Sequence, residues 1–346
     1  MKKFIFLQGA CITLCICACA ALGSCSTPDS AAAALMLGGS SQAPVFLGCR
    51  AVSNDEVEFE FSQPVKVTSL NFEPALKVLS VEDGSTVKVR LDESPQPGTL
   101  LTADLLAEDS GKNTVNVLVP FRSRNDRMPQ LVINELRADY SNSNSRIRVE
   151  FIEFKTKTAG NLGAMRVFFA GSSQKPEMYE FAPVETGSGE YIVLHLRKME
   201  EACKDEYTSN LAESGGYPSS PEGRDFWFPG VDKLINKIAG YVYVLDQDDN
   251  VLAAVMHSEA PASWWTKDYL AQTAEFLHQK GAWTAADGGV CRPADAISTA
   301  GITATRTACR DETAENTNTA ANWYIVNTSG DTPGKKNNTE RYTPKN

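Results

Sequence analysis

The chain has 346 residues, of which 42% are hydrophobic, and it carries a formal net charge of −10. This hydrophobic content lies well above that of disordered chains, and the length suits two folded domains with terminal tails. The acidic balance argues against binding to nucleic-acid phosphates, which requires a positive surface. No nucleic-acid partner is therefore expected.

Residues 1–24 have the features of a secretory signal peptide. Lys2 and Lys3 precede an apolar stretch that ends in small residues. This stretch is too short for a comfortable membrane-spanning helix. The closing letters LGSC, residues 22–25, resemble a bacterial lipobox. In lipoproteins with that motif the peptide is cut before the cysteine, whose thiol receives a diacylglycerol and whose new amine is acylated.

The lipobox resemblance implies that Cys25 anchors the protein, because several acyl chains on one residue hold a protein stably on a membrane. The alternative is an ordinary signal peptide with Cys25 as an incidental thiol. Ser26 follows the cysteine, which by resemblance to bacterial sorting rules favours the outer membrane. The periplasmic and surface faces both remain open. Residues 25–44 are small and flexible and are expected to form a tether.

Four cysteines remain beyond the lipobox, namely Cys49, Cys203, Cys291 and Cys309. An even number in an exported protein favours disulfides. Cys291 and Cys309 would close a short loop and are the expected pair, while the pairing of the other two stays open. The histidines show no metal-ligand spacing among themselves or with these cysteines. No metal and no cofactor are therefore expected.

Residues 45–122 contain short alternating strands without helical periodicity. In the stretch DEVEFEFSQPVKV, Val57, Phe59 and Phe61 face one way and the intervening glutamates face the other. That alternation is typical of a half-buried strand. Similar runs follow after a turn at Asp83-Gly84 and after further turn sequences, and together they predict a β-sandwich.

Two stretches of this region, VEFEFSQPV and PGTLLTADLLAEDSGKN, resemble the bacterial Ig-like modules of surface proteins. Those modules carry a strand ending in a Phe-Ser-x-Pro-Val pattern, followed by a Pro-Gly-Thr turn and a later Asp and Gly-Asn. The resemblance implies an Ig-like sandwich over residues 45–122. It implies nothing about chemistry.

The second region, residues 130–336, contains the motifs VINEL, VEFIEF, GNLGAMRV and GEYIVLH, a hairpin around DQDDN, and the terminal NTAANWYIVN and TPGKKN. In this order they resemble the lamin-tail domain, an Ig-like β-sandwich of nuclear lamins and of many exported bacterial proteins. Asn322 stands where that family has an Asp before the Trp. Long insertions at about 198–235 and 258–290 also depart from the pattern.

The second insertion predicts a helix within SWWTKDYLAQTAEFLHQKG. Ser263 can cap it, Leu270, Ala274 and Leu277 share one face, and Gly281 can end it. The predicted fold class is therefore all-β, with two Ig-like β-sandwich domains in tandem and helical insertions in the second. Residues 337–346 are expected to form a disordered tail.

The acids Glu135, Glu150 and Glu153 lie inside apolar runs, where a carboxylate is costly unless it is partnered. The lamin-tail resemblance implies that they belong to the framework of the domain. The alternative is an envelope metal-dependent nuclease or hydrolase that uses Asp139, Glu153 and Lys155. In that pattern two carboxylates bind Mg²⁺ and a lysine assists a water nucleophile.

Aromatic residues concentrate in the two insertions, at Trp227 in the first and at Trp264 and Trp265 in the second. If exposed, these rings could stack on sugars or anchor a protein partner, and if buried they pack the insertions onto the sandwich. The expected function is a non-catalytic, lipid-anchored envelope protein that binds or scaffolds proteins or glycans. The membrane is reached through the lipid on Cys25. A purely structural spacer without a defined ligand is the remaining possibility.

Overall fold

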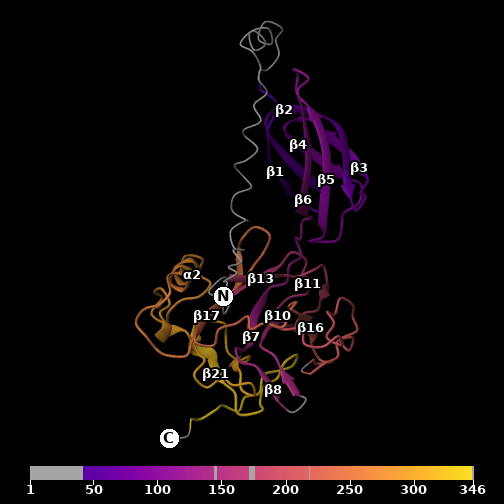
Figure 1. Ribbon diagram of the computed structural model, residues 1–346. Helices are drawn as coiled ribbons and strands as arrows, with labels where there is room; N and C mark the ends of the chain where they lie inside the picture. Colours follow the sequence, from indigo (N-terminus) through magenta and orange to yellow (C-terminus); the bar gives the residue numbers. More distant parts are fainter. Residues whose placement is uncertain (1–41, 144–145, 171–175, 218, 345–346) are drawn as a thin grey trace, which may run out of the picture.

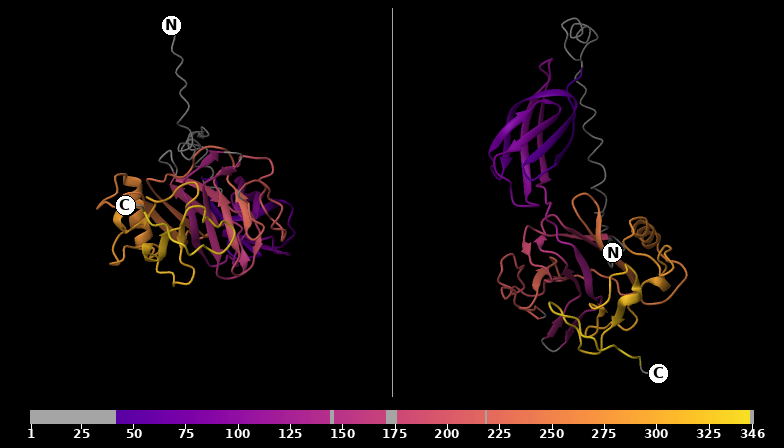
Figure 2. Two further views of the ribbon diagram at one scale, coloured as in Figure 1. Left: turned by 90° about the horizontal axis from the view of Figure 1, so that it is seen from below. Right: turned by 180° about the vertical axis from the view of Figure 1, so that it is seen from behind.

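The computed structural model describes residues 42–143, 146–170, 176–217 and 219–344. Within these ranges the elements are nearly all β-strands. Figures 1 and 2 show two lobes stacked end to end, the first built by residues up to 122 and the second by residues from 131 onward. The predicted all-β class is confirmed, whereas the Ig-like character of each lobe stays a prediction.

Several sequence predictions fall on residues outside these ranges. They are the signal peptide at 1–24, the lipidation site Cys25 and most of the tether at 25–44. In the part of the chain that the structure describes, no helix is long and apolar enough to cross a membrane.

The first lobe is built around the long strand β2. Its strands are β1 (Phe46–Ala51), β2 (Glu56–Glu73), β3 (Val78–Glu82), β4 (Gly84–Leu91), β5 (Leu100–Glu108) and β6 (Thr114–Arg122). Strand β2 pairs with β1 and β4 along its first half and with β5 along its second half. The predicted alternation is confirmed, since Val57, Phe59 and Phe61 are buried. Their side chains form a core with those of β4 and β5.

The second lobe contains two main sheets. The first has the order β16-β15-β10-β7-β20-β21 and the second β13-β12-β17-β18-β19. The strands of the first sheet are β7 (Leu131–Arg137), β10 (Phe151–Thr156), β15 (Tyr191–His195), β16 (Arg224–Trp227), β20 (Ala308–Arg310) and β21 (Trp323–Ile325). Those of the second are β12 (Arg166–Ala170), β13 (Pro176–Glu180), β17 (Ala239–Leu245), β18 (Val251–Ser258) and β19 (Ile297–Ser298).

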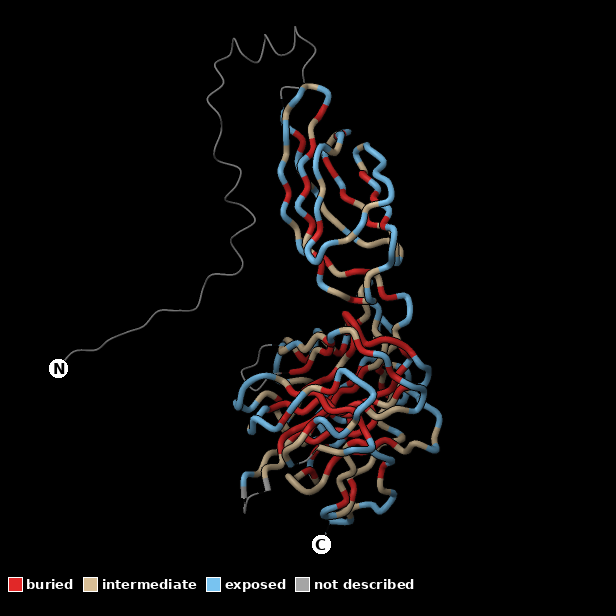
Figure 3. Tube along the Cα trace, turned by 90° about the vertical axis from the view of Figure 1, so that its right-hand side faces the viewer, coloured by how far each residue is buried: buried red, intermediate tan, exposed pale blue. Residues whose placement is uncertain are grey.

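Shorter elements complete this lobe. They are β8 (Ser141–Ser143), β9 (Arg146–Arg148), β11 (Gly160–Asn161), β14 (Glu185–Thr186), and the 3-10 helices η1 (Pro293–Asp295) and η2 (Ala320–Asn322). The core lies between the two main sheets and includes Ile152 and Phe154 of β10 and Val167 and Phe169 of β12. Figure 3 shows buried residues concentrated inside each lobe. The two cores share no buried residue.

The helix predicted in the second insertion is present as α2 (Asp268–Gln279). Its predicted buried face of Leu270, Ala274 and Leu277 is confirmed, and Gly281 adopts a positive φ of 64° just past its end. The predicted cap at Ser263 is wrong, because the helix begins after Lys267. Between them, Trp265 donates its indole N–H to the Cys291 carbonyl oxygen at 2.8 Å, which attaches this segment to the loop at Cys291.

The prediction of a disordered tail at 337–346 is wrong for its described residues. Asn337 is buried, and its amide donates to the carbonyl oxygens of Asn134 and Arg310 at 3.0 and 2.8 Å. The Tyr342 N–H donates to a carbonyl of β21 at 2.8 Å. This polar segment is ordered because its amide groups complete hydrogen bonds along the sheet.

We expect Phe59→Ala to destabilise the first lobe by about 3–5 kcal/mol, because it removes a fully buried aromatic ring. Chemical unfolding followed by far-UV circular dichroism measures this change. All five tryptophans lie in the second lobe, so fluorescence reports on that lobe alone. The fluorescence transition should stay in place, because the cores share no buried residue. Leu118→Ala, at a side chain 73% exposed, is the control and should change either transition by less than about 0.5 kcal/mol.

Candidate functional site

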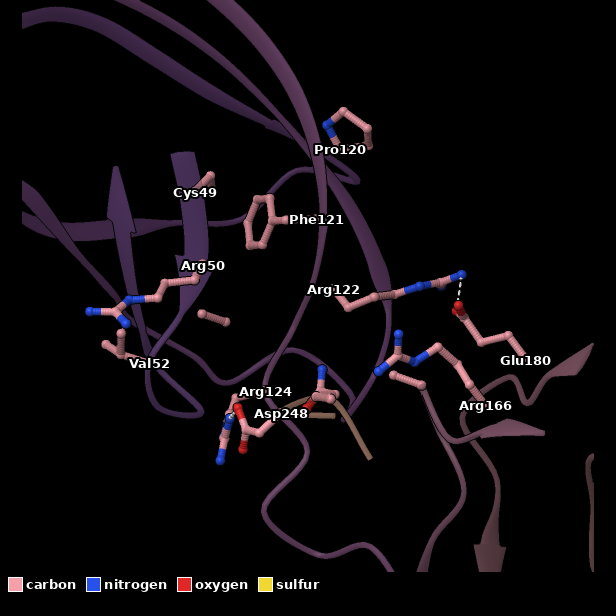
Figure 4. A pocket seen from close by; sticks show the side chains of 13 residues that line it. Cys49, Arg50, Val52, Pro120, Phe121, Arg122, Arg124, Arg166, Glu180 and Asp248 are labelled. Atoms are coloured by element: carbon pink, nitrogen blue, oxygen red, sulfur yellow. Dashed lines mark hydrogen bonds and ion pairs between the residues drawn. The ribbon is translucent and has the colours of Figure 1, made fainter. Parts of the chain in front are cut away.

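A cleft of about 530 Å³ lies where the two lobes meet. The first lobe contributes residues of β1 and β6, and the second contributes β12, β13 and the turn between β17 and β18 (Figure 4). Small and apolar side chains line part of its wall: Ala51, Val52, Pro120, Phe121 and Ala164. The charged side chains of the lining are Arg50, Arg122, Arg124, Arg166, Glu180 and Asp248.

Two of these arginines connect the lobes. Arg122, at the end of β6, forms an ion pair with Glu180 of β13. Arg124 donates to Asp126 at 2.7 Å and to Asp248, in the β17–β18 turn, at 2.8 Å. The pKa of Arg124 is raised above its ordinary value. Its hydrogen bond to Asp248 is the largest cause, and its hydrogen bond to Asp126 is the next. Both guanidinium groups therefore pair with carboxylates of the second lobe.

Arg166 reaches the cleft from β12 of the second lobe. Its Nη2 donates to the Asp246 carbonyl oxygen at 2.6 Å and to Asp249 at 2.7 Å. Figure 4 shows Arg122 and Arg166 extending from opposite lobes into the same gap, whereas Arg50 extends away from them. Arg50 instead pairs with Glu58 on its own lobe.

The segment between the lobes holds the cleft in shape. Asn125 is buried, and its side chain donates to the carbonyl oxygens of Asn161 and Gly163, each at 2.8 Å. Gln247 accepts from the Asn125 N–H at 2.7 Å and donates to the Ser123 carbonyl oxygen at 2.7 Å. Asn125 and Gln247 thus bind the connecting segment to the second lobe.

The backbones of the two lobes also touch directly. Gly98, in the loop before β5, has a φ of +72°, and a Cβ there would lie 2.2 Å from the Gly163 carbonyl carbon. A Cβ on Gly163 would lie 2.2 Å from the Pro97 carbonyl oxygen. Only glycine fits where two backbone segments approach this closely.

Glu135 and Glu153 are fully buried and lie opposite one another on β7 and β10. Glu135 accepts the Thr307 hydroxyl at 2.5 Å and both the N–H and the hydroxyl of Thr332. Glu153 accepts the Gly334 N–H at 2.6 Å. The C-terminal segment, residues 331–337, therefore covers these carboxylates and supplies part of their partners, while Thr307 and Asn134 supply the others.

Burial raises the pKa of Glu135 to about 7, although the hydrogen bond from Thr307 works against this. Burial also raises the pKa of Glu153 well above its usual range, and the neighbouring Glu135 adds to the shift. Glu150 is buried with a different partner, since Arg197 donates Nε and Nη2 to its two oxygens at 2.6 Å each. All three acids expected in the framework thus have hydrogen-bond partners inside the fold.

The residues of the nuclease alternative do not come together. Glu153 is covered by the C-terminal segment, and Lys155 donates to Glu312 and to the Tyr191 hydroxyl. Asp139 lies beyond the end of β7, past the pair formed by Arg137 and Phe151. Among the described residues, no group of three or more His, Cys, Asp or Glu side chains could hold a metal ion.

The three tryptophans predicted as binding aromatics lie in different environments. Trp227 is buried and stacks on His195 with ring centroids 3.9 Å apart, so the prediction of a binding role is wrong for this residue. Trp265 is half-buried, packs against the core and bonds to Cys291. Trp264 is 73% exposed and remains available to a partner.

The predicted disulfide between Cys291 and Cys309 is not formed. Both side chains are buried free thiols, as is Cys203, and Cys49 is a half-buried free thiol. Cys309 lies on β20 beside the Thr307 hydroxyl, while the Cys291 thiol donates to a carbonyl oxygen of its own loop. The two cysteines were paired on sequence separation alone, which does not determine the direction of their side chains.

Sequence reasoning missed the arginines of the cleft. Arg122 ends the first predicted domain, Arg124 lies between the two predicted domains, and Arg166 lies in the motif GNLGAMRV of the second. Scattered arginines carry no motif, and the only available signal was their occurrence on both sides of a domain boundary. Asp246 was better recognised, since it caps the predicted hairpin by accepting the N–H groups of Asp248 and Asn250.

A family profile described as TP_1001_2nd, protein second domain, matches residues 129–325. An uncharacterized protein from Treponema pallidum (strain Nichols) is 26% identical over 202 residues. The match covers 56% of this chain and 50% of that protein, so the chain spans about half the length of this curated relative.

Two solved structures show distant similarity. A DUF4876 family protein from Bacteroides thetaiotaomicron has a TM-score of 0.29 and 11% identity, over 82% of this chain and 94% of that one. The N-terminal part of the bacterial S-layer protein SbsC has a TM-score of 0.24 and 14% identity, over 66% of this chain and 46% of that one.

We expect Glu135→Gln to change how stability depends on pH. A raised pKa means that the folded state holds the Glu135 proton more tightly than the unfolded state. Its contribution is therefore complete below the ordinary pKa of 4.5 and is lost as pH rises toward about 7. At about 1.4 kcal/mol per tenfold change in proton affinity, the loss is on the order of 3 kcal/mol.

Urea unfolding between pH 4 and 8 measures this dependence. The variant should lose the part of the fall in unfolding free energy that comes from Glu135, because glutamine does not titrate, while the part that comes from Glu153 remains. Glu60→Gln, at an exposed acid of β2, serves as the control and should keep the wild-type dependence. Equal slopes for wild type and Glu135→Gln would contradict the prediction.

Proposed function

The chain belongs to the TP_1001_2nd protein-second-domain family, and we propose that it is a non-catalytic, lipid-anchored envelope protein. In this proposal it acts as a binding or scaffolding module for proteins or glycans at the outer membrane. The observation that carries the proposal is the cleft between the lobes, because ligand sites form preferentially where domains meet.

The distribution of polar groups supports binding rather than chemistry. Glu135, Glu150 and Glu153 are each engaged by protein donors in the interior of the second lobe. The cleft instead presents charged side chains that solvent can reach, with Arg122 and Arg166 exposing 36% and 25% of their side chains. Such guanidinium groups can bind a ligand through charge and hydrogen bonds.

We infer further that the first lobe is a bacterial Ig-like module and the second a lamin-tail-like sandwich. The order of the sequence motifs supports this inference. The motifs VINEL and VEFIEF fall on or next to the neighbouring strands β7 and β10, and TPGKKN falls in the segment that covers them.

Trp264 offers a second contact for a partner. It lies in an insertion of the second lobe and exposes 73% of its surface. Exposed aromatic side chains on loops provide large contact area at low entropic cost, and they are frequent hot spots of protein interfaces.

We expect Trp264→Ala to weaken capture of an envelope or host-matrix component at least tenfold, which corresponds to about 1.4 kcal/mol. The measurement is saturable binding of the mature chain to fractionated envelopes and to host matrix preparations. Leu118→Ala is the matched control, because Leu118 is exposed to the same 73% but lies on the first lobe. If the wild-type chain shows no saturable binding to any of these preparations, the proposed binding function is wrong.

We expect Cys25→Ser to release the protein from the membrane fraction, because the thioether-linked lipid can no longer form. Cell fractionation and metabolic labelling with an alkyne fatty acid follow this change. Cys49→Ser is the control, because Cys49 lies inside the folded first lobe, and it should leave both labelling and fractionation unchanged. Undiminished labelling of Cys25→Ser would exclude this anchor.

A further inference from the structure

We propose that the cleft between the lobes binds a monosaccharide-sized organic anion, whose carboxylate or phosphate group lies between Arg122 and Arg166. The inference rests on the proposed binding function and specifies the class of ligand for its main site. Guanidinium groups bind carboxylates and phosphates with the same hydrogen-bonding geometry, so this shared chemistry defines the ligand.

The size of the cleft suits such a ligand. Its volume of about 530 Å³ falls within the range of roughly 300–1,000 Å³ typical of small-molecule sites. Ala51, Val52 and Pro120 provide an apolar wall beside the arginines. A sugar ring has an apolar face and polar edges, and it would place its face on this wall with its anionic group toward the arginines.

The charge of the lining favours an anion. The lining contains four arginines but only two acids, Glu180 and Asp248, in a chain whose net charge is −10. Both acids already contact an arginine, at Arg122 and Arg124. The acid that pairs with Arg166 is Asp249, which lies outside the lining. Among the described residues, Arg166 thus forms no ion pair with either acid of the lining, although Glu180 lies opposite it on β13.

Donors remain free for a ligand. Among the described residues, Nε and Nη1 of Arg166 and Nε of Arg122 have no hydrogen-bond partner. Figure 4 shows these two side chains reaching into one gap from the two lobes. Charge-assisted hydrogen bonds to an oxyanion are about twice as strong as neutral ones, so two guanidinium groups would provide the main binding energy.

The arginines are preorganised for this role. Asp249 and the Asp246 carbonyl oxygen fix Arg166, and Glu180 fixes Arg122. The contact between Gly98 and Gly163, with the bonds of Asn125, fixes the two lobes relative to each other. A ligand would therefore lose little of its binding energy to ordering side chains or lobes.

Isothermal titration of the mature chain with D-glucuronate, glucose 6-phosphate and glucose tests the proposal. The first two probes carry a carboxylate and a phosphate, and glucose is the neutral control. We expect at least one anion to bind at least tenfold more tightly than glucose, with affinity that falls as salt rises. Binding of only one anion would identify the preferred group.

Arg166→Ala and Arg122→Ala should each weaken this binding at least tenfold. Arg292→Ala is the matched control, because it removes one charge from an exposed, ion-paired arginine outside the cleft. Arg166→Lys keeps the charge but loses the planar fork, and it should fall between wild type and Arg166→Ala. Thermal melting of each variant verifies that the fold is retained, and a variant that does not fold is replaced by the lysine substitution.

Equal affinity for glucose and the anions, no binding of any probe, or unchanged affinity in Arg166→Ala and Arg166→Lys would overturn the proposal. Binding of tetraglutamate peptide without binding of either sugar anion would also overturn it. These results are separable from failure of the proposed function. If the wild type and Arg166→Ala capture an envelope component equally well, the binding function is retained and only the anion site is excluded.

Discussion

Two carboxylates buried opposite each other on neighbouring strands impose the main constraint on the second lobe. Glu135 and Glu153 are paired in register on β7 and β10, where water cannot reach them. A buried acid without partners would cost several kcal/mol, so the fold must supply donors. The segment at 331–337 does this with Thr332 and Gly334, and Asp331 additionally pairs with the buried Arg137. The last part of the chain is thereby attached to the first strand of the lobe.

A second constraint lies at the junction of the lobes. Gly98 and Gly163 let the two backbones approach more closely than any side chain would allow. Asn125 and Gln247 then bind the connecting segment to the second lobe. Because the lobes are held in this way, the space beside their contact has a defined shape and set of side chains. The cleft is therefore a property of the junction and not of either lobe alone.

The polar residues divide into two groups with different roles. Buried acids such as Glu150, which is bound by Arg197, stabilise the interior through complete hydrogen bonding. Arginines at the junction, such as Arg122 and Arg166, are ion-paired yet accessible. The first group maintains the scaffold. The second group and the exposed Trp264 lie where solvent can reach them, as the proposed binding function requires.

The sequence by itself determined the features that depend on local periodicity and composition. The alternation of Val57, Phe59 and Phe61 predicted a half-buried strand, and the spacing of Leu270 and Ala274 predicted a helix face, because side-chain direction follows directly from backbone geometry. The hairpin at Asp246 was also predictable, because its turn chemistry is local.

Only the tertiary structure decided the features that depend on residues far apart in the chain. In the folded chain Cys291 and Cys309 are unpaired, Trp227 is buried and Trp264 is exposed. The polar tail, which its composition predicted to be disordered, is held by hydrogen bonds. It also brought Arg122 and Arg166 to one cleft from different lobes. Such outcomes depend on the packing of sheets and lobes, and no local pattern encodes which distant side chains will share an environment.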